Sequence, residues 1–137
     1  MPVVKELFRG ESDGSISFGD YTLNQKTKKE DVEFGGDLYK VKTFFEITKL
    51  EKNGLFVYES VPGTAVNNLA AKENGVSFSV EGYRDCEITV ELAESTQYVI
   101  SYNGEQHGLM ETNRSGKLSI GVELEEGSSV KVDIVKR

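Results

Sequence analysis

Several residue types are scarce in this 137-residue chain, and each scarcity excludes a kind of chemistry. There is no tryptophan, and Cys86 is the only cysteine, so an intrachain disulfide is impossible. Small secreted domains often depend on disulfides, and a single cysteine therefore weakly favours a reducing compartment. His107 is the only histidine, which excludes His/Cys zinc clusters and leaves one possible histidine base. We predict no catalytic residues, no metal site and no cofactor.

Positive charge and long apolar runs are also lacking. The chain has 16 Lys and Arg against 23 Asp and Glu, a net charge of −7, which argues against a nucleic-acid partner. No apolar run approaches the ~20 residues that a membrane-spanning helix needs. The opening residues, MPVVKELFRG, lack the pattern of a secretory signal. We expect no membrane partner and a cytoplasmic location, or a mature form whose leader has been removed.

The strongest positive signal is an alternation of apolar and polar residues with period two. It is clearest in VSFSV (76–80), EITVEL (87–92), KLSIGVEL (117–124) and SSVKVDIV (128–135). Alternate side chains of a strand point to opposite faces, so each run has one buried and one wet face. This pattern is typical of antiparallel sheets, and it predicts an all-β fold.

Turn signals separate these runs. Asp13-Gly14, Asn53-Gly54, Asn74-Gly75 and Asn103-Gly104 suit the tight turns of β-hairpins. In the second half we predict seven strands, at 65–70, 76–81, 87–92, 97–102, 105–111, 117–124 and 129–135. In the first half we predict strands at 3–9, 15–23, 31–34, 37–43, 45–50 and 54–61. NNLAAKENG and TKKEDVEF are weak helix candidates.

Seven short strands in about 75 residues are typical of an immunoglobulin-like sandwich. We therefore predict an antiparallel β-sandwich, immunoglobulin-like in residues 64–137. Residues 1–63 would form a smaller β-sheet or roll packed on it. About 60 residues are marginal as an independent unit, so we expect one cooperative unit or two modules with a large interface.

Candidate binding residues come from the tyrosines and from one turn. A tyrosine has an apolar ring and a polar tip, which suits a sugar-binding surface as well as a half-buried strand. Phe18, Phe34, Phe56 and Phe78 lie on alternating runs, which favours positions in the core. The predicted binding residues are Tyr21, Tyr39, Tyr58, Tyr83, Tyr102, Asn113 and Arg114.

The stretch from Tyr98 to Val122 carries a resemblance. It contains Tyr98, Ile100, Asn103 and Gly104 in one strand and turn, followed by TNRSGKLSI (112–120). This pattern resembles the C-terminal immunoglobulin-like accessory modules of some polysaccharide-degrading enzymes. With GDLYKVKT and EITKLEKNGLFVYESVPGTAV, the whole chain also resembles small bacterial proteins that are sometimes labelled endosialidase. The first resemblance implies fold rather than activity.

Three functions remain open, of which the third, a structural accessory domain that stabilises or spaces a larger assembly, looks the same in sequence as the first. The first is a non-catalytic β-rich module for binding or assembly, whose partner would be a protein, a second copy of the chain or a glycan. The second is a small glycan-acting hydrolase that uses an Asp/Glu pair, which the sequence cannot select among 23 acids. Exposed strand edges would make homo-oligomers possible.

Overall fold

The computed structural model describes residues 3–137, and its regular structure is antiparallel β-strand apart from one short 3-10 helix, η1 (Lys5–Leu7). The strands form two sheets. In spatial order the larger sheet contains β1 (Phe8–Gly10), β2 (Ile16–Phe18), β7 (Ala65–Lys72), β8 (Gly75–Glu81), β13 (Ser129–Lys136), β10 (Gln97–Tyr102) and β11 (Glu105–Glu111). The smaller contains β12 (Lys117–Val122), β9 (Cys86–Glu91), β6 (Leu55–Val61), β5 (Ile47–Lys52), β4 (Asp37–Phe44) and β3 (Thr27–Phe34). The all-β prediction is confirmed.

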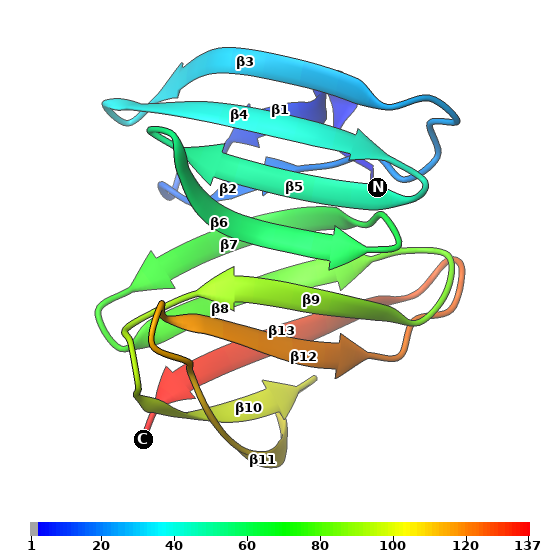
Figure 1. Cartoon of the computed structure of the whole chain (residues 1–137). Helices are drawn as coiled ribbons and strands as arrows, with labels where there is room; N and C mark the ends of the chain where they lie inside the picture. The colour runs from blue at the N-terminus through cyan, green and yellow to red at the C-terminus, as the bar shows by residue number, and fades with distance from the viewer. Residues whose placement is uncertain (1–2) are drawn as a thin grey trace.

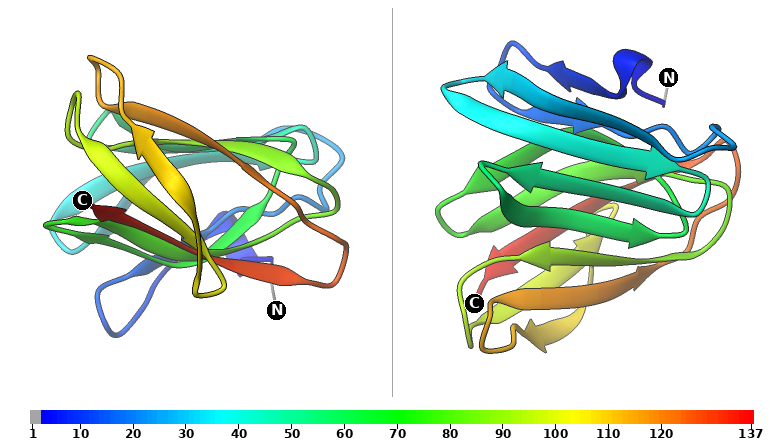
Figure 2. Two further views of the ribbon diagram at one scale, coloured as in Figure 1. Left: turned by 90° about the horizontal axis from the view of Figure 1, so that it is seen from below. Right: turned by 45° about the horizontal axis from the view of Figure 1, so that its top comes forward.

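The two sheets lie one behind the other, and a common core fills the space between them (Figure 1; Figure 2). At its centre Tyr58 of β6 contacts the rings of Phe18 and Phe78, which belong to the other sheet. Both contacts are edge-to-face, with ring centroids 5.2 and 5.7 Å apart, a geometry that adds about 1 kcal/mol to each pair beyond area burial. These three fully buried rings join the layers.

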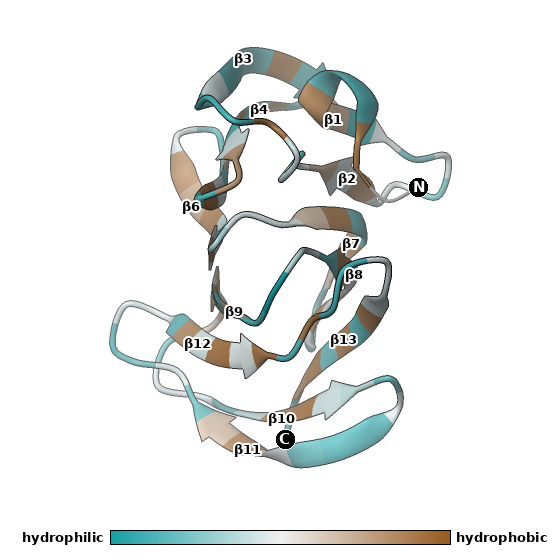
Figure 3. Ribbon diagram, turned by 90° about the vertical axis from the view of Figure 1, so that its right-hand side faces the viewer, coloured by the Kyte–Doolittle hydropathy of each residue, from teal (hydrophilic) through white to brown (hydrophobic). Residues whose placement is uncertain are grey.

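The alternation seen in the sequence becomes the two faces of each sheet. Hydrophobic and hydrophilic residues alternate along β12 and β13 (Figure 3), and Leu118, Ile120 and Val122 of β12 are buried. Two of the predicted turns close hairpins with both residues at positive φ, namely Asn53-Gly54 at 52° and 81° and Asn103-Gly104 at 53° and 84°. Their twist matches that of the strands that they connect.

All seven strands predicted in the second half form, but they are not confined to one sheet. Five lie in the larger sheet and two, β9 and β12, in the smaller. Strands from the two halves pair directly, β2 with β7 and β6 with β9. Hydrogen-bonded ladders therefore cross the expected boundary at residue 63 in both sheets. Whether 1–63 and 64–137 can be separated as folding units stays a prediction.

The first half departs from the predicted strands in two places. The expected strand 15–23 stops at Phe18, because Gly19 has φ 99° and Asp20 folds back to accept a hydrogen bond from Thr22 N. The expected strand 3–9 is η1 followed by the short β1. Both weak helix candidates are wrong: NNLAAKENG lies mostly in β7, and TKKEDVEF is β3, so strand pairing overrides a weak local preference.

Candidate functional site

The seven predicted binding residues lie in different parts of the molecule. Strands β4 and β12 begin at the left-hand end of the sheets in Figure 1, and Tyr39, Asn113 and Arg114 lie close to these starts in the sequence. Strands β8 and β10 end at the right-hand end; Tyr83 follows β8, Tyr102 ends β10, and Tyr21 stacks on Tyr83. Tyr58 lies in the core between them. They do not form one site, so each is considered with its own contacts.

Tyr58 is fully buried and belongs to a network of hydroxyl groups. Its hydroxyl lies 2.8 Å from Thr64 Oγ1, which is also 2.7 Å from Ser60 Oγ. Thr48 Oγ1 donates to the Thr64 carbonyl at 2.7 Å and lies 2.8 Å from Thr43 Oγ1. Burial raises the pKa of Tyr58 well above its ordinary value. No face of this ring is left for a ligand, and the network seals the interior toward the right-hand end.

Tyr21 and Tyr83 do come together, at the right-hand end. Their rings stack with centroids 6.1 Å apart, and the Arg84 guanidinium lies 5.5 Å from the Tyr83 ring centroid. Tyr83 donates its hydroxyl to the Phe45 carbonyl at 2.6 Å, and Tyr21 donates to Glu81 Oε2 at 3.0 Å. Burial, followed by the Glu81 carboxylate, raises the pKa of Tyr21 to about 12. These tyrosines contact one another and tie loops together.

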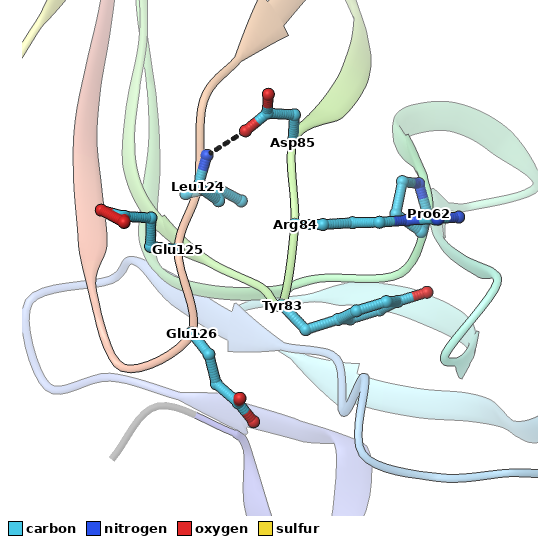
Figure 4. A pocket seen from close by; sticks show the side chains of 7 residues that line it. All are labelled: Pro62, Tyr83, Arg84, Asp85, Leu124, Glu125 and Glu126. Carbon is cyan, nitrogen blue, oxygen red and sulfur yellow. Dashed lines mark hydrogen bonds between the residues drawn. The ribbon is translucent and has the colours of Figure 1, made fainter.

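A broad, shallow hollow lies beside them (Figure 4). The Tyr83 ring and the Arg84 side chain extend side by side toward Pro62, while Glu125 and Glu126 point away from them. The Asp85 carboxylate is occupied, since it accepts a hydrogen bond from Leu124 N at 3.0 Å. The polar groups of this hollow therefore do not converge on one point.

Tyr102 holds the two sheets together at the lower edge. Its hydroxyl donates to the Gly121 carbonyl of β12 at 2.8 Å, and its ring centroid lies 4.7 Å from that of His107. His107 lies in β11, as predicted, and is exposed. The main contacts of Tyr102 thus hold β10 near the free edge of β12.

Asn113 and Arg114 occupy the turn before β12. Asn113 Oδ1 accepts hydrogen bonds from Ser115 N, Ser115 Oγ and Lys117 N, each at 2.9 Å. This carboxamide oxygen therefore shapes the turn, as asparagine commonly does. Arg114 is exposed at its tip.

Tyr39 lines a more enclosed hollow at the left-hand end, and we take this left-end hollow as the candidate site. It has a volume of about 370 Å3 and lies where strand ends of the two sheets meet. The buried side chains of Ile16 and Leu69 from the larger sheet belong to its lining. The full lining is Gly14, Ile16, Phe34, Gly35, Asp37, Tyr39, Lys52, Phe56, Val57, Leu69, Ala71 and Glu91.

Two local features of the backbone shape this hollow. Gly35-Gly36 and Asn53-Gly54 are both turns with positive φ at each residue, so the ends of β3, β4, β5 and β6 reach the same end of the sheet. An irregularity between Leu50 and Glu51 lets β6 place Val57 against the core and in the lining. Such bulges redirect side chains near strand ends.

Aromatic rings form much of the wall. Tyr39 packs on Phe8 with ring centroids 4.9 Å apart, and its pKa is raised by burial. A Cβ added at Gly10 would lie 2.1 Å from the Phe34 ring, so that ring packs directly on the Gly10 backbone. Lys117 lies 4.9 Å from the Phe56 ring centroid. The wall is therefore held by close contacts before any ligand arrives.

Charged groups line the same hollow. Lys52 Nζ lies 3.5 Å from Asp37 Oδ2, and Asn53 Nδ2 donates to Asp37 Oδ1 at 2.9 Å. The Asn53 hydrogen bond and then the Lys52 charge lower the pKa of Asp37. Glu91 Oε1 lies 3.8 Å from Lys117 Nζ. Two carboxylates and one ammonium thus accompany the apolar lining.

Sequence reasoning found Tyr39 but missed the other members of this site. It placed Phe34 and Phe56 in the core, whereas both are only half-buried and line the hollow. Asp37 and Lys52 could have been found from the turns: each directly flanks a Gly-rich turn, and hairpin pairing brings Lys52 opposite Tyr39. The contribution of Leu69 and Ala71 depends on how the sheets stack, which periodicity does not report.

Within residues 3–137 no group of three or more His, Cys, Asp or Glu side chains is arranged to hold a metal ion. None of the helical segments described there is long and apolar enough to cross a membrane. No family model matches the chain, and neither a curated protein nor a solved structure matches it. The function is therefore argued from the left-end hollow.

Proposed function

We propose that the chain is a non-catalytic binding module that holds one sugar unit of a glycan in the left-end hollow. The observation that carries this proposal is the combination of half-buried aromatic rings and charged groups around one partly open hollow of about 370 Å3. Ligand pockets commonly measure about 300–1,000 Å3 and combine an apolar lining with few polar groups. The C–H face of a sugar suits the rings of Phe34 and Phe56, and its hydroxyls suit carboxylate acceptors and an ammonium donor.

The aromatic residues of the right-hand end are less suited to bind a sugar than those of the left-end hollow. Tyr21 and Tyr83 stack on each other, and Arg84 lies over Tyr83. A sugar would have to displace these contacts to stack on either ring, and the hollow beside them is shallower than the left-end hollow. We also keep, as part of the proposal, the immunoglobulin-like character of the second half and a cytoplasmic location. Protein or self-association remains the competing form of the binding function.

Titration calorimetry with neutral oligosaccharides of different linkage tests the proposal. We expect at least one to bind, and Phe56→Ala to weaken it by about tenfold, as for the loss of a central aromatic contact. Phe45→Ala is the matched control, because Phe45 is exposed at the opposite end. Equal effects of the two variants, or no binding at all, would contradict the proposal. A dimer by light scattering would favour self-association instead.

A glycan hydrolase is the second candidate, because Asp37 and Glu91 both line the hollow beside Tyr39. One carboxyl of such a pair must hold a proton as general acid, which requires a raised pKa. The pKa of Asp37 is lowered, so Asp37 suits that role poorly. Release of reducing sugar that disappears in both Asp37→Asn and Glu91→Gln would favour the hydrolase; binding without release favours the binding module.

A further inference from the structure

The outer face of the smaller sheet carries a continuous row of polar side chains that crosses all six strands. Successive register pairs connect Lys28 to Lys42, Lys42 to Lys49, Lys49 to Glu59, Glu59 to Thr89 and Thr89 to Ser119. Directly paired residues share one face of a sheet. The adjacent positions Val41, Leu50 and Tyr58 are buried, so the row faces outward.

Three lysines occupy adjacent positions at one end of this row. Lys28, Lys42 and Lys49 are direct cross-strand neighbours, and like charges placed opposite each other destabilise a sheet. Lys28 pairs with Glu30 at 3.4 Å and Lys49 with Glu51 at 3.7 Å. Lys42, between them, has no ion pair among residues 3–137. Of the three lysines of this lysine row, only Lys42 lacks a paired carboxylate, and Glu59 on β6 follows Lys49, on a chain of net charge −7.

We propose that the lysine row binds an acidic polysaccharide, laid across the strands with its carboxylates against Lys28, Lys42 and Lys49. Neighbouring strands are about 4.8 Å apart, so the backbone positions of the three lysines repeat at about the length of one sugar residue. Duplex DNA carries one charge per about 1.7 Å, a density that three lysines do not match. The hydroxyls of Thr89 and Ser119, 2.8 Å apart, continue the row toward sugar hydroxyls.

This surface is separate from the left-end hollow. None of the row residues lines that hollow. The two proposals can therefore fail independently: the hollow is tested with neutral oligosaccharides and Phe56, and the row with a polyanion and Lys42.

Affinity electrophoresis at low ionic strength provides the test, with polygalacturonate as the acidic polymer and fully methyl-esterified pectin as its uncharged counterpart. We expect polygalacturonate to retard the protein and the ester to leave its mobility unchanged. Lys42→Thr should weaken binding about three- to fivefold, the loss of one ion contact. Its melting temperature should not fall, because two like-charge contacts disappear. Lys42→Arg keeps the charge and should keep binding.

Lys131→Thr is the matched control. Lys131 also lies on a strand, pairs with Asp133 at 4.0 Å and belongs to the other sheet, so its loss changes net charge equally. Equal weakening by Lys42→Thr and Lys131→Thr would overturn the proposal, since general charge would then explain binding. Absence of retardation, equal retardation by the ester, or stronger binding of duplex DNA would overturn it as well.

Discussion

The space between the two sheets is filled differently at the two ends of the molecule. Toward the right-hand end, buried hydroxyls around Thr64 fill the space between the sheets, and Tyr21, Tyr83 and Arg84 cover one another. At the left-hand end the sheets leave a hollow of about 370 Å3 with half-buried rings and charged groups. The interior around Thr64 is sealed by its own side chains, whereas the left-end hollow is open to a partner. A second hollow of about 340 Å3, lined by Tyr102 and His107, lies at the right-hand end.

Titratable groups are perturbed at both ends, and burial raises the pKa of Tyr39 at the open end as well. Burial raises the pKa of Tyr21, Tyr58 and Cys86, which lie in or toward the sealed end. At the open end the pKa of Asp37 is lowered, because its carboxylate accepts a hydrogen bond from Asn53. The aromatic rings have packing partners at both ends, and the rings of the open end differ in that Phe34 and Phe56 also border the hollow.

Removing a buried hydroxyl from the sealed end should have the largest effect on stability. Thr64→Val removes the hydroxyl that contacts Tyr58 and Ser60, leaving both buried groups short of a partner. We expect a loss of about 2–4 kcal/mol in the free energy of unfolding. Urea unfolding followed by far-ultraviolet circular dichroism measures it. Thr89→Val, whose hydroxyl is on the outer face, should cost less than about 0.5 kcal/mol. Similar costs would refute a sealed end.

The second-largest effect should be a difference between the two ends in the rate at which a cysteine thiol is labelled. Cys86 is 7% exposed, and burial raises its pKa to about 12, so native Cys86 should react slowly with a disulfide reagent. Ala71 is exposed and lines the hollow. In a Cys86→Ala background, Ala71→Cys should react at least about tenfold faster. In urea the labelling rates of the two cysteines should become equal. Similar labelling rates in the native protein would contradict the difference between a sealed and an open end.

The smallest effect should come from acid titration of Glu11, near the open end. Its carboxylate accepts hydrogen bonds from Ser17 Oγ at 2.5 Å and Arg9 Nε at 2.9 Å, which lower its pKa below the ordinary value of a glutamate. Folding thus favours the ionised form. The stabilisation is present above the unfolded-state pKa and is lost as pH falls through the folded-state pKa.

Glu11→Gln should therefore flatten the decline of the urea midpoint between about pH 5 and pH 2. Glu87→Gln, at an exposed position of β9, serves as the control and should leave the decline unchanged. A steeper decline in Glu11→Gln than in the parent would contradict the assignment.

Much of the fold could be predicted from the sequence, because alternation and Asn-Gly turns act locally. The alternation around Leu118 and Ile120 predicts which face of the strand is buried, and Asn103-Gly104 predicts the hairpin turn. The pairing of β2 with β7 and of β6 with β9 could not be predicted, since no local signal records which distant strand is a neighbour. The residues that line the site could not be predicted for the same reason. Tyr39 was predicted, but Leu69, which lines the same hollow, comes from the other sheet.

We propose that the ligand binds at the open end and not at the sealed end. Amide chemical-shift mapping, with the oligosaccharide that binds best in calorimetry, tests it most directly. We predict that the amides of Gly14, Gly35, Tyr39, Phe56 and Ala71 shift on titration while those of Tyr83 and Arg84 stay in place. Shifts concentrated at Tyr83 and Arg84, with the left-end hollow unchanged, would contradict the account.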